Sequence, residues 1–268
     1  MRPQVVAHRG ASHDTAEHTL LAYTRALEVG AEALECDVRL TADGHLVCVH
    51  DRDLRRTAAT RGVVSTMNLA ELDQLDFASW KNPWAELDDE APDRDPETGK
   101  VLTLRKLLET VADHGQGVEL AIETKHPTRY GGLVERRLVE LLADFGWDGR
   151  DSPVRVMSFS RTAIARIRHL APDLRVVILI EKAHHWPLLK QAIGPSWILG
   201  PGVTELQDHP TFAKALRKSG RDIHVWTVNT PEQLQTCLDV GARAIISDKP
   251  AYMIQLLDAQ NGGRRYAR

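Results

Sequence analysis

The sequence predicts an α/β fold, most simply a closed (β/α)8 barrel. Short β-rich runs alternate with amphipathic runs along the whole chain, which is the pattern of strands alternating with helices. Most of the β-rich runs are almost continuously apolar, as in parallel strands covered on both faces. About eight such units fit into the 268 residues, a length typical of one barrel. We therefore expect a single domain over residues 1–268. A doubly wound open sheet is the alternative, because no sequence repeat distinguishes the two.

The expected strands are short runs rich in valine, isoleucine, leucine and alanine. They are Gln4–Ala7, Ala33–Arg39, Leu46–His50, Val118–Glu123, Val154–Ser158, Arg175–Leu179, Trp197–Leu199, Ile223–Thr227 and Ala244–Ser247.

The expected helices carry apolar residues at helical spacing, and several stop at a glycine. They are Thr19–Val29, Leu104–His114, Gly132–Phe145, Arg161–Leu170, Thr211–Ser219 and Glu232–Val240. Pro231 before the last of these and Gly241 after it show the usual asymmetry of helix ends.

One stretch breaks the alternation after the second strand. Asp43-Gly44 between two β-like runs predicts a hairpin. Between His50 and Thr103 the chain lacks strong strands and contains a short expected helix, Asn68–Leu75, and an acidic loop, Glu86–Lys100. We interpret residues 45–102, approximately, as an inserted subdomain over the catalytic face, where long excursions of such barrels lie.

The composition limits the possible partners. The net charge of −3 gives no bulk attraction to nucleic acid or to an anionic membrane. No apolar run is long enough for a signal peptide or a transmembrane segment. Three cysteines without paired spacing favour buried, reduced thiols. We expect a cytoplasmic protein that acts on a small molecule, and the oligomeric state stays open.

Three carboxylates form a candidate metal site. Glu35 and Asp37 lie two apart in an expected strand, so both point to one face. Two buried like charges are costly unless a cation balances them, and oxygen ligands suit a hard cation. Glu123 ends another strand and is a candidate third ligand, with Lys125 on the same face to neutralise a phosphate oxygen. An exposed edge strand, pairing with arginines, or a structural ion pair at Glu123 and Lys125 are the alternatives.

Two histidines are candidates for acid and base catalysis. His8 ends the first strand and His50 the hairpin's return run, and a pair of opposite protonation can move protons near neutral pH. Arg9 can bind phosphate through two parallel hydrogen bonds. Trp226, near the end of a later expected strand, could form an apolar wall beside a substrate, with core packing as the alternative. Together these residues indicate metal-assisted phosphodiester chemistry.

The motifs resemble the glycerophosphodiester phosphodiesterase family in order and spacing. They are His8-Arg9-Gly10, Glu17-His18-Thr19, Glu35-Cys36-Asp37, Thr41-Ala42-Asp43-Gly44, His50-Asp51, Leu102-Thr103-Leu104, Ala121-Ile122-Glu123-Thr124-Lys125, Ser158-Phe159-Ser160, Val225-Trp226-Thr227-Val228-Asn229 and Ala244-Ile245-Ile246-Ser247-Asp248-Lys249-Pro250. The chain departs from the family pattern at His18, where asparagine is usual, and at Ala16, where proline is usual.

The resemblance implies a phosphodiesterase-type (β/α)8 barrel with a small inserted subdomain. It implies a divalent ion, Ca²⁺ or Mg²⁺, on Glu35, Asp37 and Glu123. It also implies His8 and His50 as general acid and base, with Arg9 and Lys125 on phosphate.

The resulting hypothesis is hydrolysis of a glycerophosphodiester to glycerol 3-phosphate and an alcohol. A related phosphodiesterase that acts on lysophospholipid or phosphoinositide headgroups and stops at a cyclic phosphate is one alternative. A catalytically silent binding module is another. The preferred alcohol and the choice between the two ions stay open.

Overall fold

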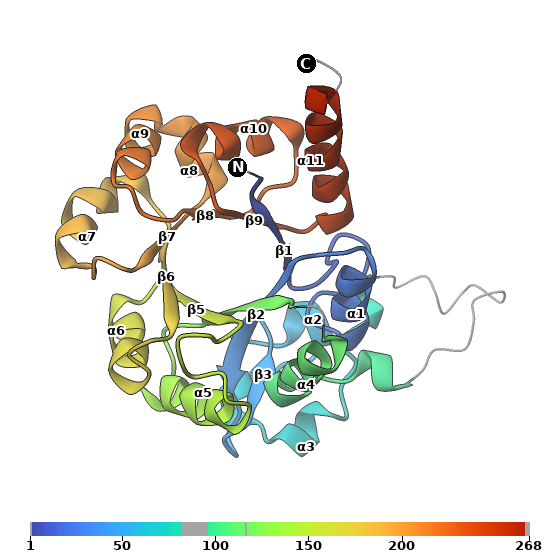
Figure 1. Ribbon diagram of the computed structural model, residues 1–268. Coiled ribbons are helices and arrows are strands. Elements are labelled where there is room, and N and C mark those ends of the chain that lie inside the picture. Colours follow the sequence, from blue (N-terminus) through green and yellow to red (C-terminus); the bar gives the residue numbers. More distant parts are fainter. Residues whose placement is uncertain (1, 82–95, 116, 266–268) are drawn as a thin grey trace.

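The computed structural model describes residues 2–81, 96–115 and 117–265, and their parallel strands stand in a ring (Figure 1). Neighbouring strands follow the order β7-β6-β5-β4-β2-β1-β9-β8, so strands that succeed one another around the barrel pair in parallel. Single parallel bridges, Leu199 with Ile223 and Gly202 with Trp226, join β7 to β8 and nearly close the ring. The predicted (β/α)8 barrel is confirmed, and the open-sheet alternative is wrong.

The ring consists of eight strands within the described residues. They are β1 (Gln4–His8), β2 (Ala33–Leu40), β4 (Glu119–Thr124), β5 (Val154–Ser158), β6 (Arg175–Ile180), β7 (Ile198–Pro201), β8 (His224–Val225) and β9 (Ala244–Ser247). All were expected, with ends that differ by up to two residues.

Helices cover the outside of the ring (Figure 1). They are α1 (Leu20–Glu28), α4 (Leu104–His114), α5 (Leu133–Asp144), α6 (Arg161–Leu170), α7 (Trp186–Ala192), α8 (Val203–Asp208), α9 (Pro210–Lys218), α10 (Pro231–Val240) and α11 (Pro250–Arg265). Three of these, α7, α8 and α11, were not predicted.

Local capping explains where α10 begins and ends. The Thr230 hydroxyl accepts a hydrogen bond from the Gln233 amide at 3.3 Å, and the Gln233 side chain accepts one from the Thr230 amide at 3.1 Å. This reciprocal arrangement satisfies two amides that have no partner in the first turn. Gly241 ends the helix at φ +77°, a conformation that glycine adopts without steric cost.

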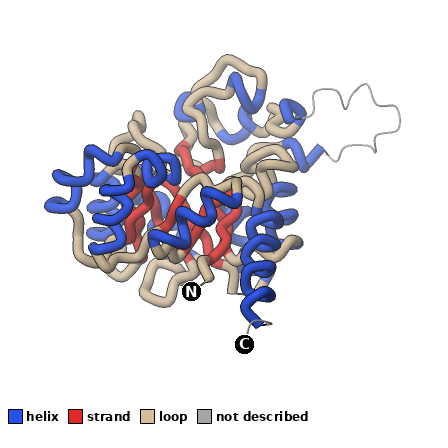
Figure 2. Tube along the Cα trace, turned by 90° about the horizontal axis from the view of Figure 1, so that it is seen from above, coloured by secondary structure: helices blue, strands red, loops and turns tan. Residues whose placement is uncertain are grey.

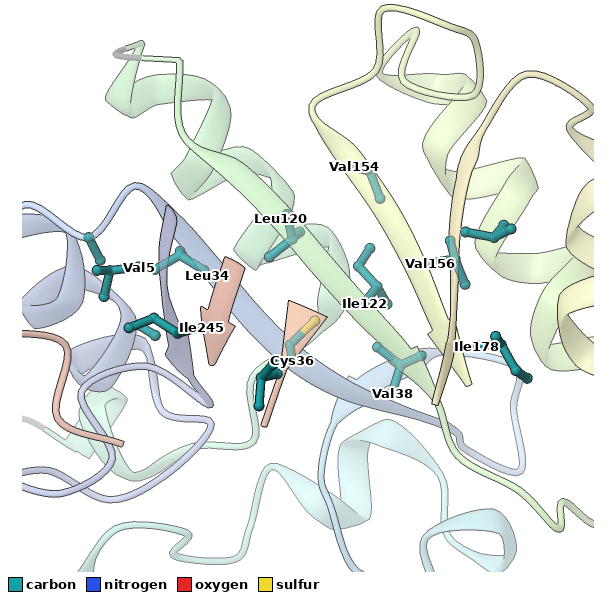
Figure 3. Close-up of a cluster of buried hydrophobic side chains, with 14 of the residues drawn as sticks. Val5, Leu34, Cys36, Val38, Leu120, Ile122, Val154, Val156, Ile178 and Ile245 are labelled. Carbon is teal, nitrogen blue, oxygen red and sulfur yellow. The ribbon is translucent and has the colours of Figure 1, made fainter. Parts of the chain in front are cut away.

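The core has two layers because side chains alternate along each strand. One set points outward and packs against the helices, including Leu34, Cys36 and Ile122 (Figure 3). A smaller set, including Ala33 and Ala121, fills the interior of the ring. Since Ala33, Glu35 and Asp37 alternate along β2, they share the inner side. The fold therefore places the carboxylates of Glu35 and Asp37 inside the barrel.

Between β2 and α4 the chain forms a separate small cluster above the ring. β3 (Leu46–Cys48) pairs with β2 in antiparallel fashion, and the short helices α2 (Arg55–Ala58) and α3 (Leu69–Leu72) follow. Their apolar side chains pack together: Val47, Val49, Leu54, Ala58, Val64, Leu72, Phe77 and Val101. Figure 2 shows this part at the end of the barrel opposite the amino terminus. The boundaries 45–102 stay a prediction, and residues 86–95 of the expected acidic loop lie outside the described residues.

The second strand of the hairpin, expected over Leu46–His50, is shorter in the structure. It ends at Cys48 instead of His50, so His50 lies in the loop that follows, and the expected helix over residues 68–75 is limited to Leu69–Leu72.

The part of the chain that the structure describes contains no helix long and apolar enough to cross a bilayer. The cytoplasmic location stays a prediction.

Truncating a leucine of the outer core layer tests this description. Leu120 on β4 is fully buried, so Leu120→Ala should lower the free energy of unfolding by roughly 2–5 kcal/mol, the lost transfer energy plus a cavity. Leu188→Ala is the matched control, because Leu188 is 78% exposed and its truncation should cost less than about 0.5 kcal/mol. Urea unfolding of the two variants measures both values. Equal costs would show that Leu120 does not lie in the core.

Candidate active site

Three carboxylates lie together inside the barrel at the carboxyl ends of β2 and β4. Asp37 and Glu123 are direct partners in the parallel register of the two strands. Glu35, Asp37 and Glu123 each offer one oxygen, and these oxygens lie within 4.8 Å of one another. The exposed fractions of the three residues are 2%, 1% and 7%. This set of buried oxygen ligands could hold one hard divalent cation.

Burial and mutual repulsion oppose ionisation of this acidic cluster. Burial, together with the Asp37 charge, raises the pKa of Glu35 well above its ordinary value and that of Glu123 to about 7. Burial opposes ionisation of Asp37 too, but Lys125, His18 and Arg9 outweigh it and hold the Asp37 pKa low. The surrounding charges thus favour ionisation of Asp37, while Glu35 and Glu123 are shifted toward the protonated form. A divalent cation would supply the missing charge, so the residues present fit such an ion.

Lys125 and Arg9 lie against these carboxylates. The Lys125 Nζ atom is 2.9 Å from Asp37 Oδ1 and 2.8 Å from Glu123 Oε1. Arg9 Nε is 3.0 Å from Asp37 Oδ2, and the Arg9 amide donates to Glu35 Oε2 at 3.0 Å. Both expected phosphate-binding cations therefore border the acidic cluster.

Gly10 sets the turn that presents His8 and Arg9. It has φ +84°, and a Cβ atom there would lie 2.5 Å from the carbonyl carbon of Ala22. Only glycine allows this close approach of the β1 end to α1.

His8 is oriented by a carboxylate that the sequence reasoning missed. His8 Nδ1 lies 2.6 Å from Asp248 Oδ1, and Asp248 also accepts hydrogen bonds from Ser12 at 3.1 Å and Asn229 at 2.7 Å. Burial raises the pKa of Asp248, but these hydrogen bonds outweigh burial and lower the pKa to about 2. The ionised carboxylate accepts a hydrogen bond from Nδ1–H of His8 and leaves Nε2 facing the cluster, 4.0 Å from Glu35 Oε2. A charged residue directly after the last strand was the available signal for Asp248.

His50 has a similar carboxylate partner, the next residue in its own loop. Its Nδ1 lies 2.7 Å from Asp51 Oδ1. Burial, helped by the charges of Arg9 and Lys125, lowers the pKa of His50 to about 4 despite the opposing effects of Asp37 and Asp51. His50 is therefore neutral near pH 7 and able to accept a proton.

Ion pairs connect the inserted part to the barrel, and the sequence reasoning missed them as well. Arg56 on α2 donates to Asp51 at 2.6 Å and to both oxygens of Glu17 at 2.7 and 2.8 Å. Glu17 in turn accepts from Arg9 at 3.0 Å. The chain of contacts runs from the partner of His50 to a cation beside Asp37, so the two halves of the site are held in one network.

His18 replaces the usual asparagine with a buried imidazole. Its Nε2 lies 3.0 Å from Asp37 Oδ2 and its Nδ1 lies 2.8 Å from the Tyr23 hydroxyl. Burial lowers the pKa of His18. The neutral ring can donate from Nε2 to Asp37 and accept at Nδ1 from Tyr23, so His18 makes a hydrogen bond to the acidic cluster.

The sequence-predicted residues surround one cavity of about 140 Å³ at the mouth of the barrel. Its polar wall consists of His8, Arg9, Glu35, His50, Glu123 and Lys125. Asp37 lies directly behind Lys125. Trp226 is on the apolar wall, where its ring meets Phe159 edge-on at 5.5 Å and its Nε1 donates to the Gly200 carbonyl at 2.8 Å.

Comparison with known families agrees with this geometry. Residues 8–252 match the family described as the glycerophosphoryl diester phosphodiesterase family. The chain belongs to this family. It is therefore an enzyme, a phosphodiesterase, and the resemblance noted in the sequence is confirmed.

Individual relatives of this phosphodiesterase cover almost all of it. It is 42% identical over 252 residues to a probable glycerophosphodiester phosphodiesterase 1 of Mycobacterium tuberculosis, covering 92% of this chain and 90% of the relative. It is 30% identical over 249 residues to a glycerophosphodiester phosphodiesterase of Bacillus subtilis, covering 91% and 83% of the two chains.

A solved structure shares the fold over nearly its full length. A phosphodiesterase of Oleispira antarctica, in complex with its product sn-glycerol-3-phosphate, superposes with a TM-score of 0.78 at 26% identity, covering 96% of this chain and 97% of that one.

The protonation of Glu123 predicts how cation binding depends on pH. A group whose pKa is raised to about 7 holds a proton below pH 7, and a cation must displace it. The apparent affinity for Mg²⁺ should therefore fall about tenfold or more from pH 8 to pH 6, with proton release on binding. Calorimetric titration of the metal-free protein in buffers of different ionisation enthalpy measures both effects.

Glu123→Gln should reduce this proton release and weaken binding, whereas Glu109→Gln on the outer helix α4 should change neither. Equal affinity at pH 6 and pH 8 would contradict the assignment.

Proposed function

We propose that this phosphodiesterase hydrolyses glycerophosphodiesters to glycerol 3-phosphate and an alcohol with the aid of Ca²⁺ or Mg²⁺. The observation that carries the proposal is the convergence of two histidines, two cations and an acidic cluster on one cavity. The cocrystallised product of the Oleispira antarctica relative supports the choice of a glycerol phosphate.

In this proposal Glu35, Asp37 and Glu123 hold the cation. The bound ion would draw charge from a phosphate oxygen and lower the pKa of a coordinated hydroxyl. Arg9 and Lys125 border the same cavity and would neutralise further phosphate oxygens. Trp226 would cover the apolar side of the substrate.

The two histidines would divide the proton transfers. His50, with its pKa lowered to about 4, is neutral near pH 7 and would accept the proton of the attacking glycerol hydroxyl. His8, fixed by Asp248, would protonate the leaving alcohol. The attack would form a bond from the glycerol oxygen to phosphorus and break the bond from phosphorus to the alcohol, which gives a cyclic phosphate. Water would then open this ring, with His8 as base and His50 as acid. Direct attack by water on phosphorus is the other route that this pair could serve.

Two further interpretations were open from the sequence. A phosphodiesterase that acts on lysophospholipid or phosphoinositide headgroups would accumulate a cyclic phosphate, which phosphorus NMR of the product distinguishes from glycerol 3-phosphate. The silent binding module has no support, since the chain belongs to a family of enzymes.

We also propose a single barrel domain over residues 1–268, with residues 45–102 as an insertion. The insertion contributes His50 to the cavity. The insertion would therefore form one wall of the proposed active site.

Removing either histidine tests the acid and base assignment. His8→Ala and His50→Ala should each lower kcat on glycerophosphocholine by roughly 10²–10⁴-fold, and a chelator should abolish turnover of the parent enzyme. His169→Ala on the exposed face of α6 is the matched control and should keep near-full activity. If both site variants stayed nearly as active as the control, neither histidine would be the acid or base.

Asp248 should matter through His8. Asp248→Asn keeps the size of the side chain but no longer favours the Nδ1–H tautomer of His8, so kcat should fall on the order of 10²-fold or more. The exposed Asp258→Asn on α11 is the control for loss of a carboxylate. Measuring kcat and KM for the two variants tests whether Asp248 acts by orienting His8. A fall in substrate affinity alone, with kcat intact, would show that Asp248 does not orient a catalytic group.

A further inference from the structure

A second, strongly basic pocket lies beside the catalytic cavity, between the inserted part and the loop from β4 to α5. It is small, with a volume of about 30 Å³, and it is lined by Arg39, Leu40, Arg52, Val64, Ser65, Lys125, Pro127, Thr128, Arg129 and Val134. Four of these residues are cations, two carry hydroxyl groups and none is acidic. Lys125 lines both this pocket and the catalytic cavity, so the two are adjacent.

The fold builds this pocket from the same strand that carries the acidic cluster. Side chains alternate along β2, so Arg39 follows Glu35 and Asp37 on one face, one step nearer the barrel mouth. The Arg39 guanidinium donates to the His50 carbonyl from Nε at 3.0 Å and from Nη2 at 2.7 Å. The Tyr130 hydroxyl donates to the Ser65 carbonyl at 2.6 Å and ties the β4–α5 loop to the inserted part. The pocket walls are thus fixed to each other and to the backbone of His50.

The arginines of this pocket differ from the other cations near the site in having no acidic partner. Lys125 pairs with Asp37 and Glu123, and Arg56 pairs with Glu17 and Asp51. No ion pair among the described residues involves Arg39, Arg52 or Arg129. Arg39 is partly buried and contacts a neutral carbonyl, while Arg129 lies over the Tyr130 ring.

The acidic residues nearest to Arg39 are already engaged. Asp37 and Glu123 contact Lys125, and Asp51 contacts Arg56 and His50. These carboxylates attract Arg39 electrostatically, and Arg52 repels it, but no carboxylate among the described residues forms an ion pair with Arg39, Arg52 or Arg129. A bound anion would therefore meet guanidinium groups that no acidic side chain occupies. Arginine forks and neighbouring hydroxyl groups are the donors that recognise phosphate oxygens.

We propose that this pocket binds a phosphoryl group, either a second phosphate on the leaving alcohol of the substrate or free orthophosphate. The first source rests on the proposed hydrolase function. It would make this enzyme select glycerophosphodiesters whose leaving alcohol is itself phosphorylated, because the pocket adjoins the cavity in which the diester is cleaved.

A matched pair of substrates tests the first source. Glycerophosphoglycerol is compared with the same diester carrying a terminal phosphomonoester, and kcat/KM is measured for each at low salt. The parent enzyme should prefer the phosphorylated substrate at least tenfold, mainly through KM. Arg52→Ala and Arg129→Ala should each reduce this preference about tenfold. Arg61→Ala, an exposed arginine of the inserted part outside the pocket, should leave the preference unchanged.

Calorimetric titration with orthophosphate tests the second source and does not depend on turnover. Arg52→Ala and Arg129→Ala should weaken orthophosphate binding about tenfold relative to Arg61→Ala, even if neither diester is hydrolysed. Loss of phosphate binding without any substrate preference would assign the pocket to the free anion. Overturning the proposal requires that the two pocket variants match Arg61→Ala in both substrate preference and orthophosphate affinity. Failure of the hydrolase function would show instead as no turnover of either diester by the parent enzyme.

Discussion

The mutual repulsion of three buried carboxylates is the constraint on which the rest of the site depends. Glu35 and Asp37 share the inner face of β2, and the register of β2 and β4 brings Glu123 beside Asp37. Such a group is stable only if positive charge surrounds it. Arg9 and Lys125 supply part of that charge, while burial and the Asp37 charge still raise the pKa of Glu123. The proposed divalent cation would neutralise the remaining negative charge of the three carboxylates. It would also supply the positive charge that the proposed reaction needs at the phosphate.

The two proposed catalytic histidines are held from opposite sides by different parts of the chain. His8 is oriented by Asp248 at the end of β9, which is 240 residues away in sequence. His50 is oriented by its neighbour Asp51, and Arg56 connects Asp51 to Glu17 on the barrel. The inserted part is thus fixed to the barrel by the same ion pairs that position the site.

The sequence predicted the strands and the acidic cluster well because both depend on local patterns. Continuous apolar runs identify buried parallel strands, and a spacing of two residues places Glu35 and Asp37 on one face. The contacts of Glu17 and Arg56 join distant segments and left no such pattern, so the roles of these two residues were missed. Asp248 was missed although its place directly after the last strand was a signal. The short helix α7 was missed because it buries only Trp186 among its seven residues, which leaves little periodicity to detect. His50 lies in a loop since β3 ends two residues before it, although its place in the cavity was expected.

The most direct test of the account is the position of a bound cation. A crystal of this protein soaked in Mn²⁺, which takes similar oxygen ligands and scatters anomalously, would locate it. The account predicts one strong anomalous peak within about 2.0–2.6 Å of oxygens from Glu35, Asp37 and Glu123, with the Lys125 ammonium displaced from between Asp37 and Glu123. A peak bound by other residues, or no peak at saturating Mn²⁺, would contradict it.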